Sequence, residues 1–139
     1  MRQNFIFALF FSLYFIIYGG IHLYVYFKLR SALGPGWKWT VLYALFSLVM
    51  VAGSRILWVV DLSSLPALKK ALSYTSYIWM AFIFMVFNVF IMLDLLRLFL
   101  WAADWAMSSR FSDLLASPKL RAVIAVGMAA LICVYGWFE

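Results

Sequence analysis

Few residues in this chain of 139 have side chains that could do chemistry, and they lie in or beside long apolar runs. The one histidine, His22, comes six residues before Lys28, near the end of the first apolar run. Asp94 and Arg97 stand at the end of the third run, three residues apart and so on one helix face. If these runs are membrane helices, all three side chains lie near the same membrane surface. We therefore expect an intramembrane polar cluster of His22, Asp94 and Arg97, including a contact between His22 and Asp94.

This cluster has two interpretations. Ionisable residues inside a membrane often belong to proton or ion pathways, which would make the cluster a proton- or ion-responsive site. The alternative is a buried polar clamp that joins the first and third helices. One histidine and one aspartate cannot relay protons across a whole bilayer, so we favour the clamp.

Two further polar residues fall inside apolar runs, and each is a candidate for a buried polar contact. Arg55 lies near the far end of the second run, where it can extend toward the membrane surface or pair with Asp61 or Glu139. Asn88 lies in the middle of the third run, and we expect it to form a hydrogen bond to another helix. Ligand binding by Arg55 or substrate contact by Asn88 are the functional alternatives.

The sequence lacks the motifs of the common enzyme and cofactor classes. It has no P-loop, no dinucleotide-binding glycine pattern and no Gly-x-Ser-x-Gly segment. One histidine and one cysteine, Cys133, cannot supply a zinc site, a haem ligand pair or an iron–sulfur cluster. We expect no catalytic residue, no metal site and no cofactor in this chain.

Composition places the chain in a membrane. Hydrophobic residues make up 68% of it and charged residues 12%, against roughly half and a quarter in soluble domains. Aromatic residues reach 21%, and Trp and Tyr are favoured at membrane surfaces. The formal charge is +6, and almost all of the basic residues lie between the apolar runs, which indicates contact with anionic lipid headgroups rather than nucleic acid.

The apolar runs predict an all-α membrane protein, a four-transmembrane-helix bundle with up-down-up-down topology. We expect one transmembrane domain, residues 1–139, with helices at about 4–30, 37–60, 66–105 and 118–138. Pro66 is expected near the first position of the third helix, with Ser64 as its N-cap. In the last run, Ala125 and Ala129 have a small-xxx-small spacing that permits close helix approach.

The distribution of Lys and Arg predicts the orientation. The loops after the first and third runs carry seven basic residues: Lys28, Arg30, Lys38, Arg97, Arg110, Lys119 and Arg121. The opposite side carries Arg2, Lys69 and Lys70, with Arg55 near it. The positive-inside rule then places both loops in the cytoplasm and both termini outside it, in a multi-pass protein of the inner (plasma) membrane.

Three segments of the chain have a familiar pattern of polar and aromatic residues: Tyr18 to Gly34, Tyr77 to Phe82 with Leu93 to Leu98, and Val134 to Glu139. They resemble the N-terminal membrane region of bacterial membrane-bound, calcineurin-like metallophosphoesterases. The resemblance implies an anchor for a metal-dependent phosphoesterase domain that follows the last helix. The ligand motifs of that domain do not occur in this sequence, so the resemblance assigns no catalytic residue here. The chain is then either the anchor portion of such an enzyme or a stand-alone relative.

These observations predict a non-catalytic integral membrane anchor or interaction module that contacts the bilayer. Such a module could form a homo-oligomer or bind a protein partner, and the sequence leaves both alternatives open. The alternative is a small oligomeric transport or channel-like protein whose path is lined by His22, Arg55, Asn88 and Asp94. An enzyme acting on phospholipid is a third hypothesis, and only the group of His22, Asp94 and Arg97 offers it a site.

Overall fold

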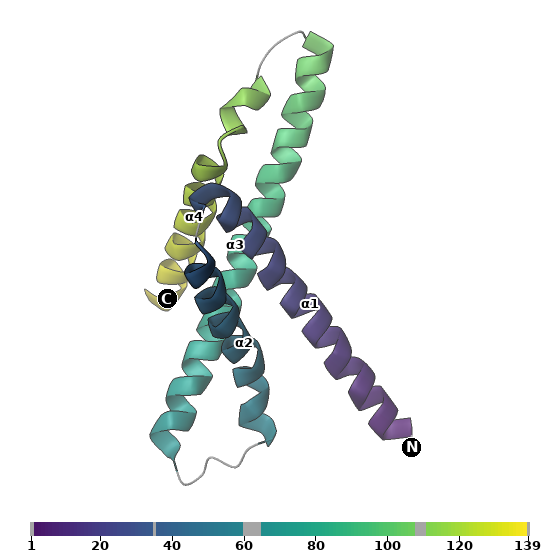
Figure 1. Ribbon diagram of the computed structural model, residues 1–139, viewed down its shortest axis with the longest axis vertical. Coiled ribbons are helices and arrows are strands. Elements are labelled where there is room, and N and C mark those ends of the chain that lie inside the picture. Colours follow the sequence, from purple (N-terminus) through teal and green to yellow (C-terminus); the bar gives the residue numbers. More distant parts are fainter. Residues whose placement is uncertain (1, 35, 60–64, 108–110, 139) are drawn as a thin grey trace. The chain divides into compact units, whose positions relative to one another are not determined.

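The computed structural model describes residues 2–34, 36–59, 65–107 and 111–138, and they form helices without any strand (Figure 1). The elements are α1 (Arg2–Leu33), α2 (Trp37–Val59), α3 (Pro66–Met107), the 3-10 helix η1 (Phe111–Leu115) and α4 (Pro118–Phe138). The predicted all-α fold with four helices is confirmed, and the helix ends differ from those expected by at most three residues.

The turn between α1 and α2 is built by glycine. Gly34 has a φ of 57°, which glycine adopts without steric cost, and its N–H donates to the carbonyl of Arg30 at 3.0 Å. Gly36 then precedes α2, and its carbonyl accepts from the N–H groups of Trp39 and Thr40. The chain therefore ends one helix and begins the next within three residues.

Proline begins both later helices. Pro66 is the first residue of α3, as predicted, and Pro118 is the first of α4. At α4 the hydroxyl of Ser117 accepts the N–H of Leu120 at 3.4 Å, which makes Ser117 the N-cap. The N-cap expected for α3, Ser64, lies outside the described residues.

Three of the described helices are long and apolar enough to cross a membrane, judged by length and composition: Leu9–Leu33, Pro66–Ala106 and Pro118–Gly136. The apolar stretch described in α2, Trp37–Gly53, is shorter. Large apolar side chains are exposed along these helices, for example Ile16, Leu48 and Phe99, each about two-thirds or more accessible. Exposed apolar surface on this scale is compatible with a membrane-embedded protein.

The chain divides into two compact units. Unit 1 comprises Met1–Leu23 and Gly36–Ala81, and unit 2 comprises Tyr24–Pro35 and Phe82–Glu139. Each has its own interior and is described by itself. The expectation of one transmembrane domain stays a prediction.

In unit 1, α2 and α3 approach closely at a glycine. A methyl group added at Gly53 would lie 2.8 Å from the hydroxyl oxygen of Ser76 and 3.4 Å from a methyl carbon of Leu72. Ser76 is buried, as are Ser47 and Met50 of α2. The small side chains at this point let the two helix backbones come together.

In unit 2, the interior follows helical spacing. Ile83, Val86, Phe90 and Leu93 of α3 are buried at steps of three or four residues. On α4 the buried residues are alanines: Ala122, Ala125 and Ala129. Ala125 and Ala129 have no exposed surface, which agrees with the close approach expected from their spacing.

The close approach in unit 1 leads to a stability prediction. Gly53→Leu should lower the stability of the protein in detergent by roughly 1–3 kcal/mol, because the added side chain must displace Ser76 and Leu72. Gly20→Leu is the matched control, since nothing lies within 4 Å of a methyl group added there. Thermal unfolding of the two variants in one detergent measures the difference. Equal midpoints for both would contradict the close approach.

Candidate functional site

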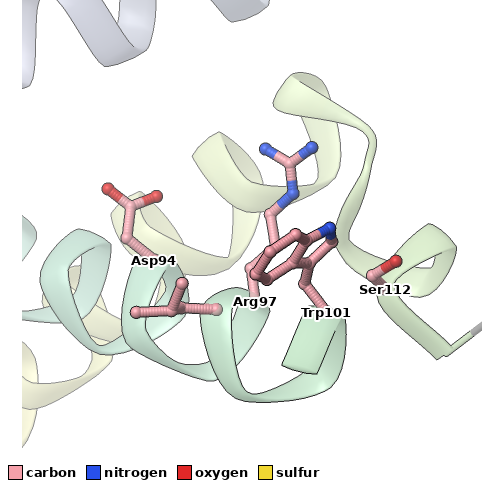
Figure 2. A pocket seen from close by; sticks show the side chains of 5 residues that line it. Asp94, Arg97, Trp101 and Ser112 are labelled. Atoms are coloured by element: carbon pink, nitrogen blue, oxygen red, sulfur yellow. The ribbon is translucent and has the colours of Figure 1, made fainter. Parts of the chain in front are cut away.

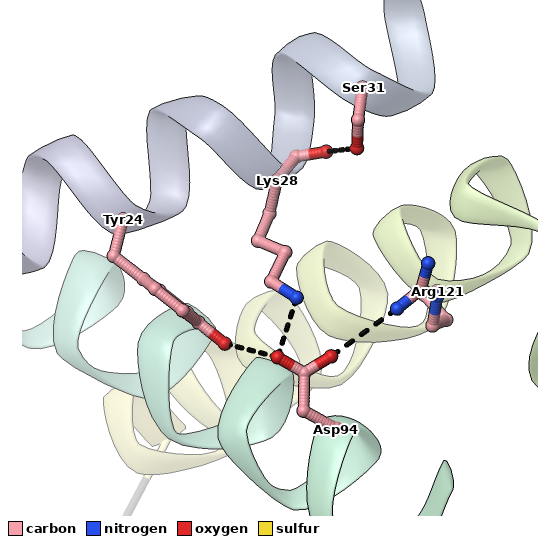
Figure 3. Close-up of polar contacts among 5 residues, drawn as sticks. All are labelled: Tyr24, Lys28, Ser31, Asp94 and Arg121. Atoms are coloured by element: carbon pink, nitrogen blue, oxygen red, sulfur yellow. Dashed lines mark hydrogen bonds and ion pairs between the residues drawn. The ribbon is translucent and has the colours of Figure 1, made fainter. Parts of the chain in front are cut away.

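The carboxylate of Asp94 is the centre of the first polar site (Figure 3). The hydroxyl of Tyr24 donates to its Oδ2 at 2.6 Å, and the ammonium of Lys28 lies 2.5 Å from the same oxygen. The guanidinium of Arg121 donates to Oδ1 at 3.3 Å. Both carboxylate oxygens are thus engaged by donors from other helices. We call Tyr24, Lys28, Asp94 and Arg121 the Asp94 cluster.

Helical spacing positions the members of the Asp94 cluster, all of which belong to unit 2. Tyr24 and Lys28 are four residues apart on α1 and so share one face, and the Lys28 ammonium lies 5.4 Å from the Tyr24 ring centre. The Tyr24 ring also meets Phe87 of α3 edge-on, at 5.3 Å between ring centres. Arg121 stands in the first turn of α4. One carboxylate on α3 therefore connects α1 and α4 to it.

This arrangement is suited to holding helices together. The Asp94 carboxylate accepts hydrogen bonds from two cationic groups and one hydroxyl. Hydrogen bonds between charged groups are stronger than those between neutral groups. The Arg121 side chain is 11% exposed and the Asp94 side chain 35%. A partly shielded ion pair is less weakened by water and salt than a fully exposed one.

A pocket of about 310 Å³ lies next to the Asp94 cluster in unit 2. Its lining residues are Asp94, Arg97, Leu98, Trp101 and Ser112. Figure 2 shows Arg97 and Trp101 side by side, with Asp94 and Ser112 on either side of them. We call it the Arg97 pocket.

The far wall of the Arg97 pocket is fixed by a hydrogen bond. The backbone N–H of Ser112 donates to the carboxylate of Asp104 at 2.8 Å, which joins η1 to the last part of α3. In the part of the chain that the structure describes, Arg97 has no ion-pair partner, because Asp94 pairs with Lys28 and Arg121. Asp94 and Arg97 thus meet in one pocket, as expected from their spacing, but without an ion pair between them.

His22 is the centre of a second polar site, in unit 1. Its Nδ1 lies 3.0 Å from the carbonyl of Tyr18, and its Nε2 lies 2.9 Å from the indole Nε1 of Trp79. Since a carbonyl only accepts and an indole N–H only donates, both bonds form with a neutral imidazole that carries its proton on Nδ1. The Tyr43 hydroxyl donates to the His22 carbonyl at 3.2 Å. This His22 cluster (Tyr18, His22, Tyr43, Trp79) links α1, α2 and α3.

The predicted site residues thus fall in different places. Asp94 and Arg97 share the Arg97 pocket, whereas His22 has a separate set of partners in the other unit. A contact between His22 and Asp94 would join the two units and stays a prediction. Asn88 is exposed and donates to the carbonyl of Phe84 in its own helix at 2.7 Å, so the structure shows an intrahelical bond where an interhelical one was expected. The Arg55 side chain lies outside the described residues.

Several functional side chains were not identified from the sequence. In the sequence, Lys28 and Arg121 indicate only the orientation of the chain, and Trp79 stands out only within a segment that carries the resemblance. The four-residue spacing of Tyr24 and Lys28 was an available signal, because it puts a hydroxyl and an ammonium on one helix face. Nothing in the sequence indicates that Arg121 or Ser112 contacts side chains of α3.

The described residues contain no group of three or more His, Cys, Asp or Glu side chains placed to hold a metal ion. Comparison with protein-family models, with curated proteins and with solved structures finds no match to this chain. The two clusters and the pocket are therefore the basis for assigning a function.

The Asp94 cluster predicts a graded loss of stability. Asp94→Asn should cost about 1–2 kcal/mol and Asp94→Leu about 2–4 kcal/mol, because the amide keeps an acceptor for Tyr24 whereas leucine leaves two cations unpaired. Asp113→Asn, at an exposed carboxylate in η1, is the control and should change little. Thermal unfolding in detergent provides the measurement. Unchanged midpoints for both Asp94 variants would show that the cluster does not hold the helices.

The His22 cluster predicts an effect of a single N–H group. Trp79→Phe should lower stability by about 1–2 kcal/mol, because it leaves the buried His22 Nε2 without its donor. Trp101→Phe is the control, since the exposed Trp101 has no bond to His22. Fluorescence-detected unfolding would measure both. A loss no larger than that of the control would argue against the Trp79–His22 bond.

Proposed function

We propose that this chain is a non-catalytic integral membrane anchor and interaction module. The observation that carries the proposal is the Asp94 cluster, in which one carboxylate is engaged by donors from two other helices. An anchor needs its helices held in a fixed arrangement, and a fully engaged carboxylate serves that purpose. The three helices long and apolar enough to span a bilayer support the same proposal.

The proposal includes a location and an orientation. The excess of Lys and Arg in the loops after α1 and α3 favours a cytoplasmic position for both loops, with both termini outside the cytoplasm, in a bacterial inner membrane. The resemblance of three segments to the membrane region of metallophosphoesterases suggests what such an anchor would carry. A phosphoesterase domain attached after α4 would then lie at the outer surface of that membrane.

Reporter fusions test the anchor proposal. Alkaline phosphatase, which is active only outside the bacterial cytoplasm, is fused after Glu139, and green fluorescent protein is fused there in a second version. We expect phosphatase activity, little fluorescence, and a product that stays in membranes washed with alkaline carbonate. Extraction of either fusion by carbonate would contradict the anchor. Fluorescence from the green fluorescent protein fusion, together with no activity from the phosphatase fusion, would indicate the opposite orientation.

Transport is the second candidate function, and one observation favours it. Two buried side-chain oxygens in unit 1, on Tyr18 and Ser76, have no hydrogen-bond partner among the described residues. Buried oxygens of this kind are a place where water or an ion can bind. With the His22 cluster, they would form the polar interior of a path.

Flux measurements separate the two functions. Liposomes containing the purified protein and a pH-sensitive or potassium-sensitive dye should leak no faster than liposomes with Ser76→Ala or His22→Gln protein. Flux above that of empty liposomes that falls at least fivefold in either variant would replace the anchor with the transport function.

A further inference from the structure

The Arg97 pocket lies on the part of α3 that follows its uncharged run, and this position limits which ligands could reach it. The uncharged run of α3 ends at Leu93, and the pocket begins at Asp94. Helix α3 has 42 residues, whereas about 20 cross the hydrocarbon part of a bilayer. The pocket therefore belongs to the stretch where a spanning helix leaves the lipid tails and meets the headgroups.

The pocket is lined by side-chain hydrogen-bond donors that have no acceptor among the described residues. The guanidinium of Arg97 is exposed and has no ion-pair partner within the described ranges. Figure 2 shows it beside the indole of Trp101, whose N–H is a donor, and near the hydroxyl of Ser112. A guanidinium with neighbouring N–H and O–H donors is the arrangement that proteins use to bind phosphate oxygens.

The charges around the pocket favour an anion as well. Arg97 lines the pocket, and Lys28 and Arg121 engage Asp94 beside it, while the carboxylate of Asp104 lies at the far wall. Three cations against these two carboxylates leave a surplus of one positive charge. The Asp94 oxygens are already engaged by Lys28 and Arg121, so their charge is offset within the Asp94 cluster. Leu98 and the faces of the Trp101 ring add an apolar wall.

We infer that the Arg97 pocket binds the phosphate group of an anionic phospholipid. Arg97 holds the phosphate through paired N–H donors, and Trp101 and Ser112 donate to its remaining oxygens. The acyl chains continue along the exposed apolar face of α3. The inference rests on the proposed function in one respect, namely that this stretch of α3 lies at the membrane surface.

Binding of short-chain lipids to the purified full chain in detergent tests the inference. Dioctanoyl phosphatidylglycerol is titrated, with dioctanoyl phosphatidylcholine and inorganic phosphate as separate arms, and native mass spectrometry counts the bound molecules. We expect one phosphatidylglycerol to bind about tenfold more tightly than either competitor. Inorganic phosphate binding as tightly as the lipid would overturn the lipid as the ligand.

Variants of the pocket show whether it, rather than charge in general, binds the lipid. Arg97→Gln should weaken phosphatidylglycerol binding about tenfold, and Arg97→Lys less, because lysine keeps the charge without paired donors. Arg30→Gln is the matched control, since Arg30 is exposed in the same unit but does not line the pocket, and its affinity should stay within twofold.

Equal losses in Arg97→Gln and Arg30→Gln would overturn the inference in favour of general surface charge. If Arg97→Gln does not fold, Arg97→Lys and Ser112→Ala decide, because both keep the backbone N–H of Ser112 on Asp104. Failure here is distinguishable from failure of the anchor function, since carbonate extraction of the reporter fusions does not depend on lipid binding to the pocket.

Discussion

The rest of unit 2 depends on one carboxylate. Asp94 stands where the apolar run of α3 ends, and it contacts Tyr24, Lys28 and Arg121 on two other helices. Apolar contacts alone hold helices together weakly in lipid, because lipid tails are as apolar as leucine side chains. A directional contact is therefore what selects one arrangement of α1, α3 and α4, and the buried alanines of α4 then allow the helices to approach.

The same reasoning applies to unit 1 through a neutral residue. His22 accepts from Trp79 and contacts the Tyr18 carbonyl, and its own carbonyl accepts from Tyr43. Backbone and side-chain polar groups that lack water must find partners inside the protein. The two units thus use one principle with different chemistry, a charged cluster in one and a hydrogen-bonded aromatic cluster in the other.

The fold could be predicted from the sequence, and only part of the site could be. Uncharged runs of about twenty residues predict the helices directly, because length and hydropathy are local properties of the sequence. Gly34, after the first helix, and Pro66, at the start of the third, mark helix ends in the same way. Asp94 stood out as a charge at the end of such a run. Its partners did not, because the side chain that reaches a given carboxylate depends on how helices rotate against each other. Arg121, 27 residues from Asp94 in the sequence and in the first turn of another helix, is the clearest case.

The central claim is that Asp94 couples α1 to α3 and α4, and a double-mutant cycle between Lys28 and Asp94 tests it most directly. Lys28→Met, Asp94→Leu and the double variant are unfolded reversibly in mixed micelles, and the coupling free energy follows from the four stabilities. The ion pair predicts a coupling of about 1 kcal/mol or more, with the double variant less destabilised than the sum of the single variants. Strictly additive effects would contradict the account.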